Sequence, residues 1–167
     1  MSAEGLAAKL LYDNLKPGLD PFSERNILVF AAGPLTGTKA APCSGRLVIG
    51  FKSPLTGTIG ISNSGGYLAP MIKRSGWDAI VAEGKSSSLV YLYVNDDKVE
   101  FKDAAYLWGM SSGDTEDKIR EELQSPKVRI AEIGPAGENK VLMSAVMVDK
   151  TRAAVVAVPV QLWAARI

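Results

Sequence analysis

Two stretches of the chain have the spacing of polar and apolar residues that is typical of a helix. In residues 5–15, four leucines fall on one face of a helix that Pro17-Gly18 would end: Leu6, Leu10, Leu11 and Leu15. Residues 112–123 are mostly polar, and Asp114 or Thr115 stands near the expected start of this second helix. Its carboxylates lie beside Lys118 and Arg120, so we expect them on a solvated face: Glu116, Asp117, Glu121 and Glu122.

Short apolar runs that are bounded by glycine or turn residues predict strands. They cover residues 26–33, 45–51, 77–84, 89–95, 98–103, 127–134 and 140–149. Asn95-Asp96-Asp97 predicts a hairpin turn between two of them. We expect the larger aromatic residues in the core: Trp77, Trp108, Tyr91 and Tyr93. Strands outnumber helices and are joined by short turns, which favours an α+β fold with mixed or antiparallel sheets and a few short helices over a doubly wound nucleotide fold.

A six-residue pattern occurs twice, as GPLTGT in residues 33–38 and as SPLTGT in residues 53–58. Each copy follows an apolar strand, and Pro-Leu-Thr-Gly is suited to a turn because proline fixes φ and glycine accepts a positive φ. Two interpretations stay open. The pattern is either a pair of similar turns in a duplicated sheet motif, or two turns that line one shared surface.

Composition narrows the function classes. The chain has 167 residues, 47% of them hydrophobic, which suits one domain with its own core. A net charge of +1 gives no electrostatic case for nucleic acid or for an acidic membrane surface. There is no histidine, and Cys43 is the one cysteine, so we expect no disulfide framework and no zinc or iron–sulfur site built by this chain. The N-terminus has no signal-peptide pattern and no run reaches the ~20 apolar residues of a membrane span, so we expect a soluble cytoplasmic protein.

One glycine-rich turn and two arginines are the candidate binding residues. Asn63-Ser64-Gly65-Gly66 precedes a short helix expected at residues 67–74, and backbone N–H groups at such a start can bind an anion. The alternative is a plain helix cap with Asn63 as N-cap. Arg46 and Arg152 could each grip a phosphate, or could be solvated surface arginines. No pair of nucleophile and general base is visible, so the residues alone predict only an α+β domain with a candidate phosphate-binding edge.

These motifs, in this order and spacing, resemble the N-terminal domain of the tungsten-containing aldehyde ferredoxin oxidoreductase family. The resemblance runs from Gly5 to Ala154 through GLAAKLLYDNLKPGLDPFS, GPLTGT, KSPLTGTIG, NSGGY, GWDAIVAEGK, IGPAGEN and RAA. It implies a pair of related sheets that form a base for a tungsten (or molybdenum) ion held by two molybdopterins, with magnesium bridging the pterin phosphates. It also implies oxidation of aldehydes to carboxylic acids, with electrons passing through a 4Fe-4S cluster to ferredoxin.

The resemblance assigns candidate roles to residues that match its motifs. Arg46 would contact the pterin, and Asn63, Ser64 and Gly65 would hold pterin and phosphate. Arg152 and Ala153 would contact the second phosphate region, with Asn63 and Ala153 as the candidates at the magnesium. Together these would form one cofactor-binding site, with no catalytic residue assigned to this chain.

Several features depart from the family pattern. The family has roughly thirty more residues before Gly5, and Cys43 and Pro70 stand where it usually has other residue types. The iron–sulfur cysteines and the acid/base residues of the family lie in later domains. We therefore expect a truncated chain that is inactive alone and needs the missing C-terminal domains or a separate subunit. The alternative is a standalone binding module for pterin, phosphate or a partner subunit.

The last residues do not continue the family pattern. After the domain of residues 1–154, the tail VVAVPVQLWAARI (155–167) replaces a family segment that continues as GRGGxGAVMGSKN. Codons for the tail, read one base earlier, permit GRGGTGAVMGGKN, and the codons of Trp163 and Ile167 are the most restrictive. We therefore interpret residues 155–167 as an out-of-frame tail that packs poorly; the alternative is chance mimicry by a permissive code.

Overall fold

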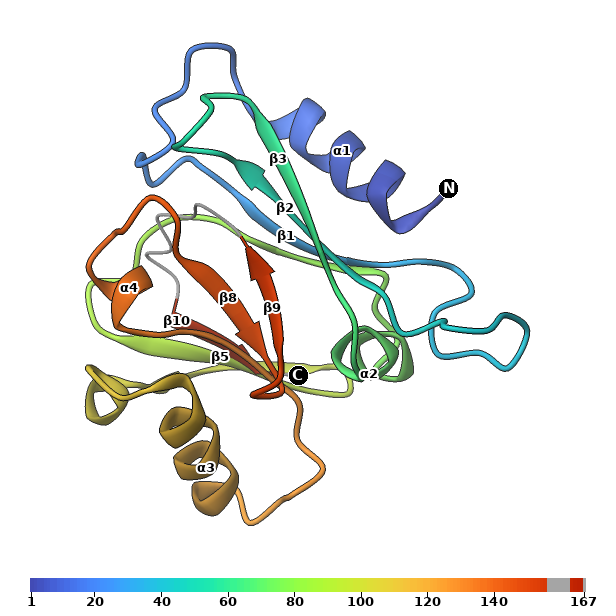
Figure 1. Cartoon of the computed structure of the whole chain (residues 1–167), viewed down its shortest axis with the longest axis vertical. Helices are drawn as coiled ribbons and strands as arrows, with labels where there is room; N and C mark the ends of the chain where they lie inside the picture. The colour runs from blue at the N-terminus through green and yellow to red at the C-terminus, as the bar shows by residue number, and fades with distance from the viewer. Residues whose placement is uncertain (156–162, 167) are drawn as a thin grey trace.

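The computed structural model describes residues 1–155 and 163–166, and these build four layers: a helix, a four-strand sheet, a six-strand sheet and a second helix (Figure 1). The outer helices are α1 (Ala3–Asn14) and α3 (Ser112–Glu122). Shorter helices are α2 (Leu68–Arg74), the 3-10 turn η1 (Ala105–Leu107) and α4 (Pro135–Glu138). The predicted α+β class is confirmed.

The four-strand sheet has the order β3-β2-β1-β4 and is antiparallel throughout. Its strands are β1 (Leu28–Ala32), β2 (Leu47–Lys52), β3 (Ile59–Ser64) and β4 (Ala79–Ala82). Strand β3 was not expected from the sequence. Its residues, IGISNS, alternate between more and less exposed positions but include glycine, serine and asparagine, which weakens the strand pattern.

The six-strand sheet has the order β6-β5-β10-β7-β8-β9. Strand β10 runs parallel to β5, and all the other pairs are antiparallel. The strands are β5 (Val90–Asn95), β6 (Lys98–Asp103), β7 (Ile130–Ile133), β8 (Ala145–Val148), β9 (Arg152–Val155) and β10 (Trp163–Arg166).

Two halves of the chain repeat one connection pattern. In each half a helix is followed by three antiparallel strands, and a fourth strand pairs antiparallel with the first of them: α1 with β1–β4, and α3 with β7–β10. A serine caps each helix, since the Ser2 hydroxyl accepts from the Gly5 N–H and the Ser111 hydroxyl from the Asp114 N–H. A Gly-Pro pair follows the first strand of each half, at residues 33–34 and 134–135.

This repeat differs from the one that GPLTGT and SPLTGT suggested. Those two turns follow β1 and β2, which are antiparallel neighbours. Antiparallel strands end at opposite ends of a sheet, so the two turns do not line one surface, and that interpretation is wrong.

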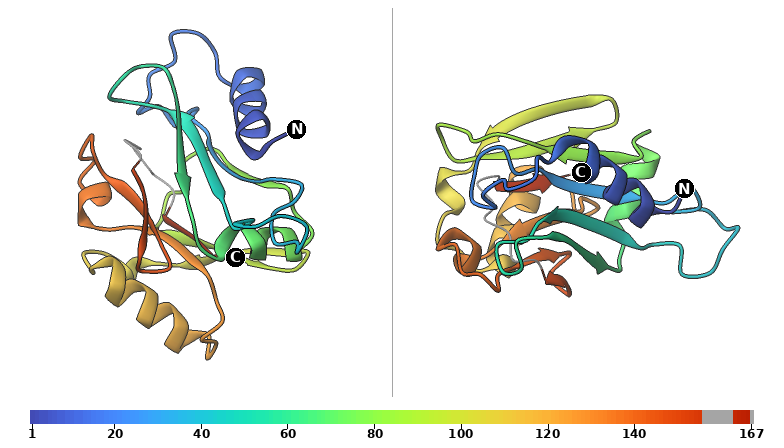
Figure 2. Two further views of the ribbon diagram at one scale, coloured as in Figure 1. Left: turned by 45° about the vertical axis from the view of Figure 1, so that its right-hand side comes forward. Right: turned by 90° about the horizontal axis from the view of Figure 1, so that it is seen from above.

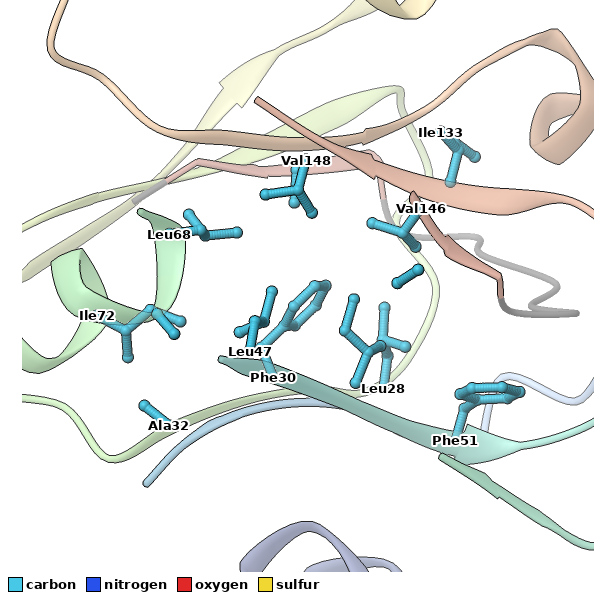
Figure 3. Close-up of a cluster of buried hydrophobic side chains, with 14 of the residues drawn as sticks. Leu28, Phe30, Ala32, Leu47, Phe51, Leu68, Ile72, Ile133, Val146 and Val148 are labelled. Atoms are coloured by element: carbon cyan, nitrogen blue, oxygen red, sulfur yellow. The ribbon is translucent and has the colours of Figure 1, made fainter. Parts of the chain in front are cut away.

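The main core lies between the two sheets (Figure 3). Leu28, Phe30 and Leu47 of the four-strand sheet point towards Val146 and Val148 of the six-strand sheet. A second cluster packs α1 against the outer face of the four-strand sheet, and a third packs α3 against the outer face of the six-strand sheet. This arrangement leaves the ends and edges of the sheets available for binding.

Three expectations about side chains and the tail need correction. Trp77 and Trp108 are 38% and 48% exposed, so they are not core residues, whereas Tyr91 is fully buried as expected. Glu116 is fully buried under α3 and is not on a solvated face. Tail residues 163–166 form β10, which pairs with β5 and β7, so the expected poor packing is wrong for their backbone. The backbone N–H and C=O groups of the two neighbouring strands can bond to a strand of any sequence. Residues 156–162 and 167 of the tail lie outside the described residues.

Candidate functional site

The predicted binding residues gather at one end of the two sheets. The pairing of Leu47 with Ser64 sets the register of β2 and β3, which puts Arg46, just before β2, beside the turn that follows β3. Arg152 begins β9, which lies next to β3 across the sheets. A β-carbon added to Gly66 would lie 3.7 Å from Cγ of Arg152. The site therefore joins three segments that are far apart in the sequence.

Glycine backbone forms the floor of this site. A β-carbon on Gly45 would lie 2.5 Å from the carbonyl oxygen of Gly66, so the two backbones are in contact and no side chain fits between them. Gly66 has φ +112°, a conformation that other residues rarely adopt, and the space around Gly65 is open. A ligand can thus approach the Gly65-Gly66 backbone closely.

Two exposed arginines flank this floor. Neither Arg46 nor Arg152 forms an ion pair with any residue in the ranges 1–155 and 163–166. An exposed guanidinium without a carboxylate partner keeps its five N–H donors for a ligand, and its planar shape suits phosphate. The structure brings Arg46, Gly65 and Arg152 to the same end of the sheets.

The other three predicted residues take different positions. Asn63 lies within β3, and its amide donates to Oε1 of Glu4 at 3.1 Å, so it is not the N-cap of α2. Tyr67 occupies that N-cap position without a side-chain hydrogen bond. Ser64 is buried, and its hydroxyl donates to the Gly65 carbonyl at 3.2 Å. Ala153 is exposed in β9, beside Arg152.

Sequence reasoning missed three residues at this end. The Arg129 guanidinium stacks over the Tyr67 ring at 4.8 Å and adds a third cation to the site. A β-carbon on Gly66 would lie 3.6 Å from Oδ2 of Asp149, and Oδ1 of Asp149 is 3.9 Å from both Arg129 and Arg120. Asp149 belongs to the β8–β9 turn and has φ 50°, but no sequence pattern distinguished it from an ordinary turn residue.

A cluster of buried charged residues contacts the β8–β9 turn. Oε2 of Glu116 is 2.8 Å from Arg120, and Oε1 of Glu116 accepts from the backbone N–H of Lys150 in the β8–β9 turn. Burial raises the pKa of Glu116. Glu132 on β7 is also buried, and burial, helped by the negative charges of Glu116 and Asp149, raises its pKa to about 9. Helix α3 is thereby tied to the turn that carries Arg152.

The donors at this edge suit an anion and not a metal held by side chains. Within the described ranges, no three His, Cys, Asp or Glu side chains gather into a metal site. A metal here would be held by backbone oxygens and by a ligand that brings its own donors. The described helices also include none that is long and apolar enough to cross a membrane.

A family model and the similar proteins identify the same family. The family model described as "Aldehyde ferredoxin oxidoreductase, N-terminal domain" matches residues 1–157. The tungsten-containing aldehyde ferredoxin oxidoreductase of Pyrococcus furiosus is 50% identical over 154 residues, which are 92% of this chain and 25% of that protein. The enzyme of the same name from Thermococcus kodakarensis is 49% identical over the same shares. The chain thus spans about a quarter of the length of these relatives.

A solved structure extends the match to three dimensions. The active site complex BamBC of benzoyl coenzyme A reductase, in complex with 1,5-dienoyl-CoA, contains a chain that is 38% identical to this one. The two superpose with a TM-score of 0.93 over 99% of this chain and 26% of that chain.

Proposed function

The chain belongs to the aldehyde ferredoxin oxidoreductase family, as its N-terminal domain, and on this premise we propose that the Gly65-Gly66 edge holds the phosphates of a tungsten–pterin cofactor. The observation that carries the proposal is the pair of exposed arginines, Arg46 and Arg152, which form no ion pair within the described residues and lie on either side of an open glycine backbone. Guanidinium groups and backbone N–H groups are the donors that phosphate prefers.

Each residue would have a separate task. Arg46 and Arg152 would grip phosphate oxygens, and Gly65 would let the ligand reach the backbone. Asn63 and Ala153, on the neighbouring strands β3 and β9, would hold a magnesium ion, Ala153 through its backbone carbonyl. Ser64 would hold the turn through its bond to the Gly65 carbonyl. When bound, the tungsten (or molybdenum) bis-molybdopterin supplies the redox chemistry.

This domain would act as the base of a larger enzyme. We propose oxidation of an aldehyde to a carboxylic acid, with electrons passed through a 4Fe-4S cluster to ferredoxin. The cluster ligands and the acid/base groups would come from further domains or a separate subunit, since the relatives named for this activity are about four times as long as this chain. The 167-residue chain alone would be inactive.

Inorganic pyrophosphate tests the site without the rest of the enzyme. We expect it to shift the amide resonances of Gly65 and Gly66, and to bind at least ten-fold more weakly after Arg46→Ala together with Arg152→Ala. Arg25→Ala is the matched control, because Arg25 is exposed beside Asn26, which bonds to Lys52 at the opposite end of β2. Equal affinity in the double variant and the control would overturn the assignment. Tungsten and pterin content of the purified chain then reports whether this half-site retains cofactor.

We further propose that residues 155–167 are translated out of frame. Resequencing the gene from the codon of Lys150 onwards tests this. A single inserted base that restores a glycine-rich segment and opens a long frame with clustered cysteines is the expected result. A confirmed stop with no such frame would show that the tail is genuine.

A further inference from the structure

Strand β6 is the outermost strand of the six-strand sheet, and within the described ranges no residue pairs with its outer edge. Figure 2 shows β6, in yellow, along one margin of the molecule. Its sequence, KVEFKD, contains no proline, and all its residues pair with β5 in continuous register. A regular edge strand presents a row of open N–H and C=O groups, to which a strand of another chain can bond.

The register of the β5–β6 hairpin shows which backbone groups are open. Asn95 pairs with Lys98 across a two-residue turn, so this pair is hydrogen-bonded, and hydrogen-bonded pairs then recur at every second residue. The Ala104 N–H donates to the Leu89 carbonyl, in agreement with this alternation. The even-numbered residues of β6 therefore bond to β5. The N–H and C=O groups that point outwards belong to Val99, Phe101 and Asp103.

The side chains of β6 are separated by face. Glu100 and Lys102 stand opposite β5 residues that belong to the cluster beneath α3, and Lys98 lies on the same face, so the charges along it alternate in sign. Val99 and Phe101 lie on the other face and are 50% and 67% exposed. Lysine on an edge strand protects it against most partners. Because a glutamate lies between the two lysines, an antiparallel strand with the same pattern can match these charges.

The two-fold registers available to β6 differ in the charges that they oppose. An axis at Glu100 would put Glu100 opposite itself and Lys98 opposite Lys102, and an axis at Lys102 would put Lys102 opposite itself. Like charges directly opposite each other destabilise strand pairing. An axis at Val99 or at Asp103 would align part of β6 with the β5–β6 turn or with η1 of the other copy, and not with its strand. An axis at Phe101 has neither fault.

We infer that β6 pairs antiparallel with β6 of a second copy of the chain, about a two-fold axis at Phe101. Phe101 then stands opposite Phe101 of the second copy, and Glu100 opposite Lys102 of the second copy on both sides of the axis. The outward groups of Val99 face those of Asp103 of the second copy, so the sheet continues from one copy into the other. Opposite charges and aromatic side chains in such cross-strand pairs both stabilise the pairing.

This contact is independent of phosphate and cofactor binding. Strand β9, which carries Arg152, is at the opposite margin of the six-strand sheet from β6. The Gly65-Gly66 edge of each copy therefore stays open in the pair. The shared area is small compared with that of a stable dimer, so we expect weak association, with the chain monomeric at micromolar concentration and paired near millimolar concentration.

Charge reversal tests the pairing in the full chain. Sedimentation equilibrium from about 10 µM to about 1 mM should show a monomer–dimer equilibrium for the parent chain. Glu100→Lys and Lys102→Glu each put like charges opposite each other, so either change alone should weaken self-association about ten-fold or more. A mixture of the two variants should associate within about three-fold of the parent chain, because every opposed pair is again of opposite charge. A parent chain that stays monomeric, or a mixture as weak as the single variants, would overturn the inference.

Lys98→Glu is the matched control for this register. Lys98 is exposed on the same face, but it would stand opposite the uncharged Ala104 of the second copy, so its reversal should leave association within about two-fold. A loss as large as that in Lys102→Glu would contradict the axis at Phe101. Amide hydrogen exchange of the parent chain needs no variant. The Phe101 N–H should exchange about ten-fold more slowly near millimolar than at micromolar concentration, and exchange that is the same at both would overturn the pairing.

Discussion

The two repeated halves share one topology but are stabilised by different chemistry. Under α1 the contact is apolar, with Ala7 and Leu11 packed on Val29 and Val48. Under α3 the apolar contact is joined by a buried charged cluster, with Glu116, Arg120 and Glu132 between the helix and the sheet. Strand pairing and the burial of one helix face therefore decide the fold, while the groups buried under each helix are free to differ.

The two helices also differ in how they are held against their sheets. Gly50 lets α1 approach the sheet closely, since a β-carbon there would lie 2.8 Å from Cδ1 of Leu11. Helix α3 is instead attached by polar bonds to the β8–β9 turn, through Glu116 and the Lys150 N–H. Polar bonds are directional, so they fix the position of the turn that carries Arg152 more closely than apolar packing would.

The largest effect should come from removing the cation of the charged cluster. Arg120→Met leaves Glu116 and Asp149 buried without their shared partner, which should lower the free energy of unfolding by about 3–5 kcal/mol. Urea denaturation of the variant measures the change. Arg74→Met, on the exposed end of α2, is the control and should change the stability by less than about 0.5 kcal/mol. A similar loss in both variants would contradict the role of the cluster.

A somewhat smaller loss is expected in the apolar half. Leu11 is fully buried, so Leu11→Ala should lower the free energy of unfolding by about 3 kcal/mol through lost burial and the cavity that remains. Tyr12→Ala, on the exposed face of the same helix, should cost much less. The loss in Leu11→Ala should not depend on pH, in contrast to variants of the charged cluster. A loss of stability that changes with pH would contradict this difference between the apolar half and the charged half.

Much of the fold could be predicted from hydrophobic patterning. The helices α1 and α3 and the strands β1, β2, β4, β5, β6, β7 and β8 all lie within or close to the expected ranges. Strand β3 could not be predicted, because its sequence is weakly patterned and the strand depends on its hydrogen bonds to β2. The charge pattern of α3 led to a wrong prediction for Glu116, since a helix with many charged residues usually exposes them. The burial of Glu116 is tolerated because its carboxylate contacts Arg120 and the backbone N–H of Lys150.

The candidate site was predictable only in part. Glycine and arginine motifs pointed to Arg46, Gly65 and Arg152, and β2, β3 and β9 bring them to one end of the sheets. Arg129, Tyr67 and Asp149 carried no local pattern, because their contacts join residues from different elements. The backbone contact of Gly45 with Gly66 likewise depends on the pairing of strands far apart in the chain.

Near pH 6, replacing Glu132 should have the smallest effect, and the opposite sign. Both carboxylate oxygens of Glu132 are buried without a hydrogen-bond partner among the described residues, and its pKa is raised from 4.5 to about 9. At neutral pH the folded state holds a proton on Glu132 that the unfolded state has released. The contribution of this group to stability therefore falls as the pH rises from 4.5 to 9, and is constant above 9.

Glu132→Gln keeps the shape of the protonated carboxyl group and cannot ionise. It should match the parent chain near pH 4 and exceed its stability by about 2 kcal/mol at pH 6, with a gap that widens up to pH 9. Urea denaturation between pH 4 and pH 9 measures this gap, and Glu100→Gln on the exposed strand β6 is the control that should show none. If the gap were the same at every pH, Glu132 would be ionised in the folded protein and must have a partner. A widening gap would show that the charged half tolerates Glu132 only in its neutral form.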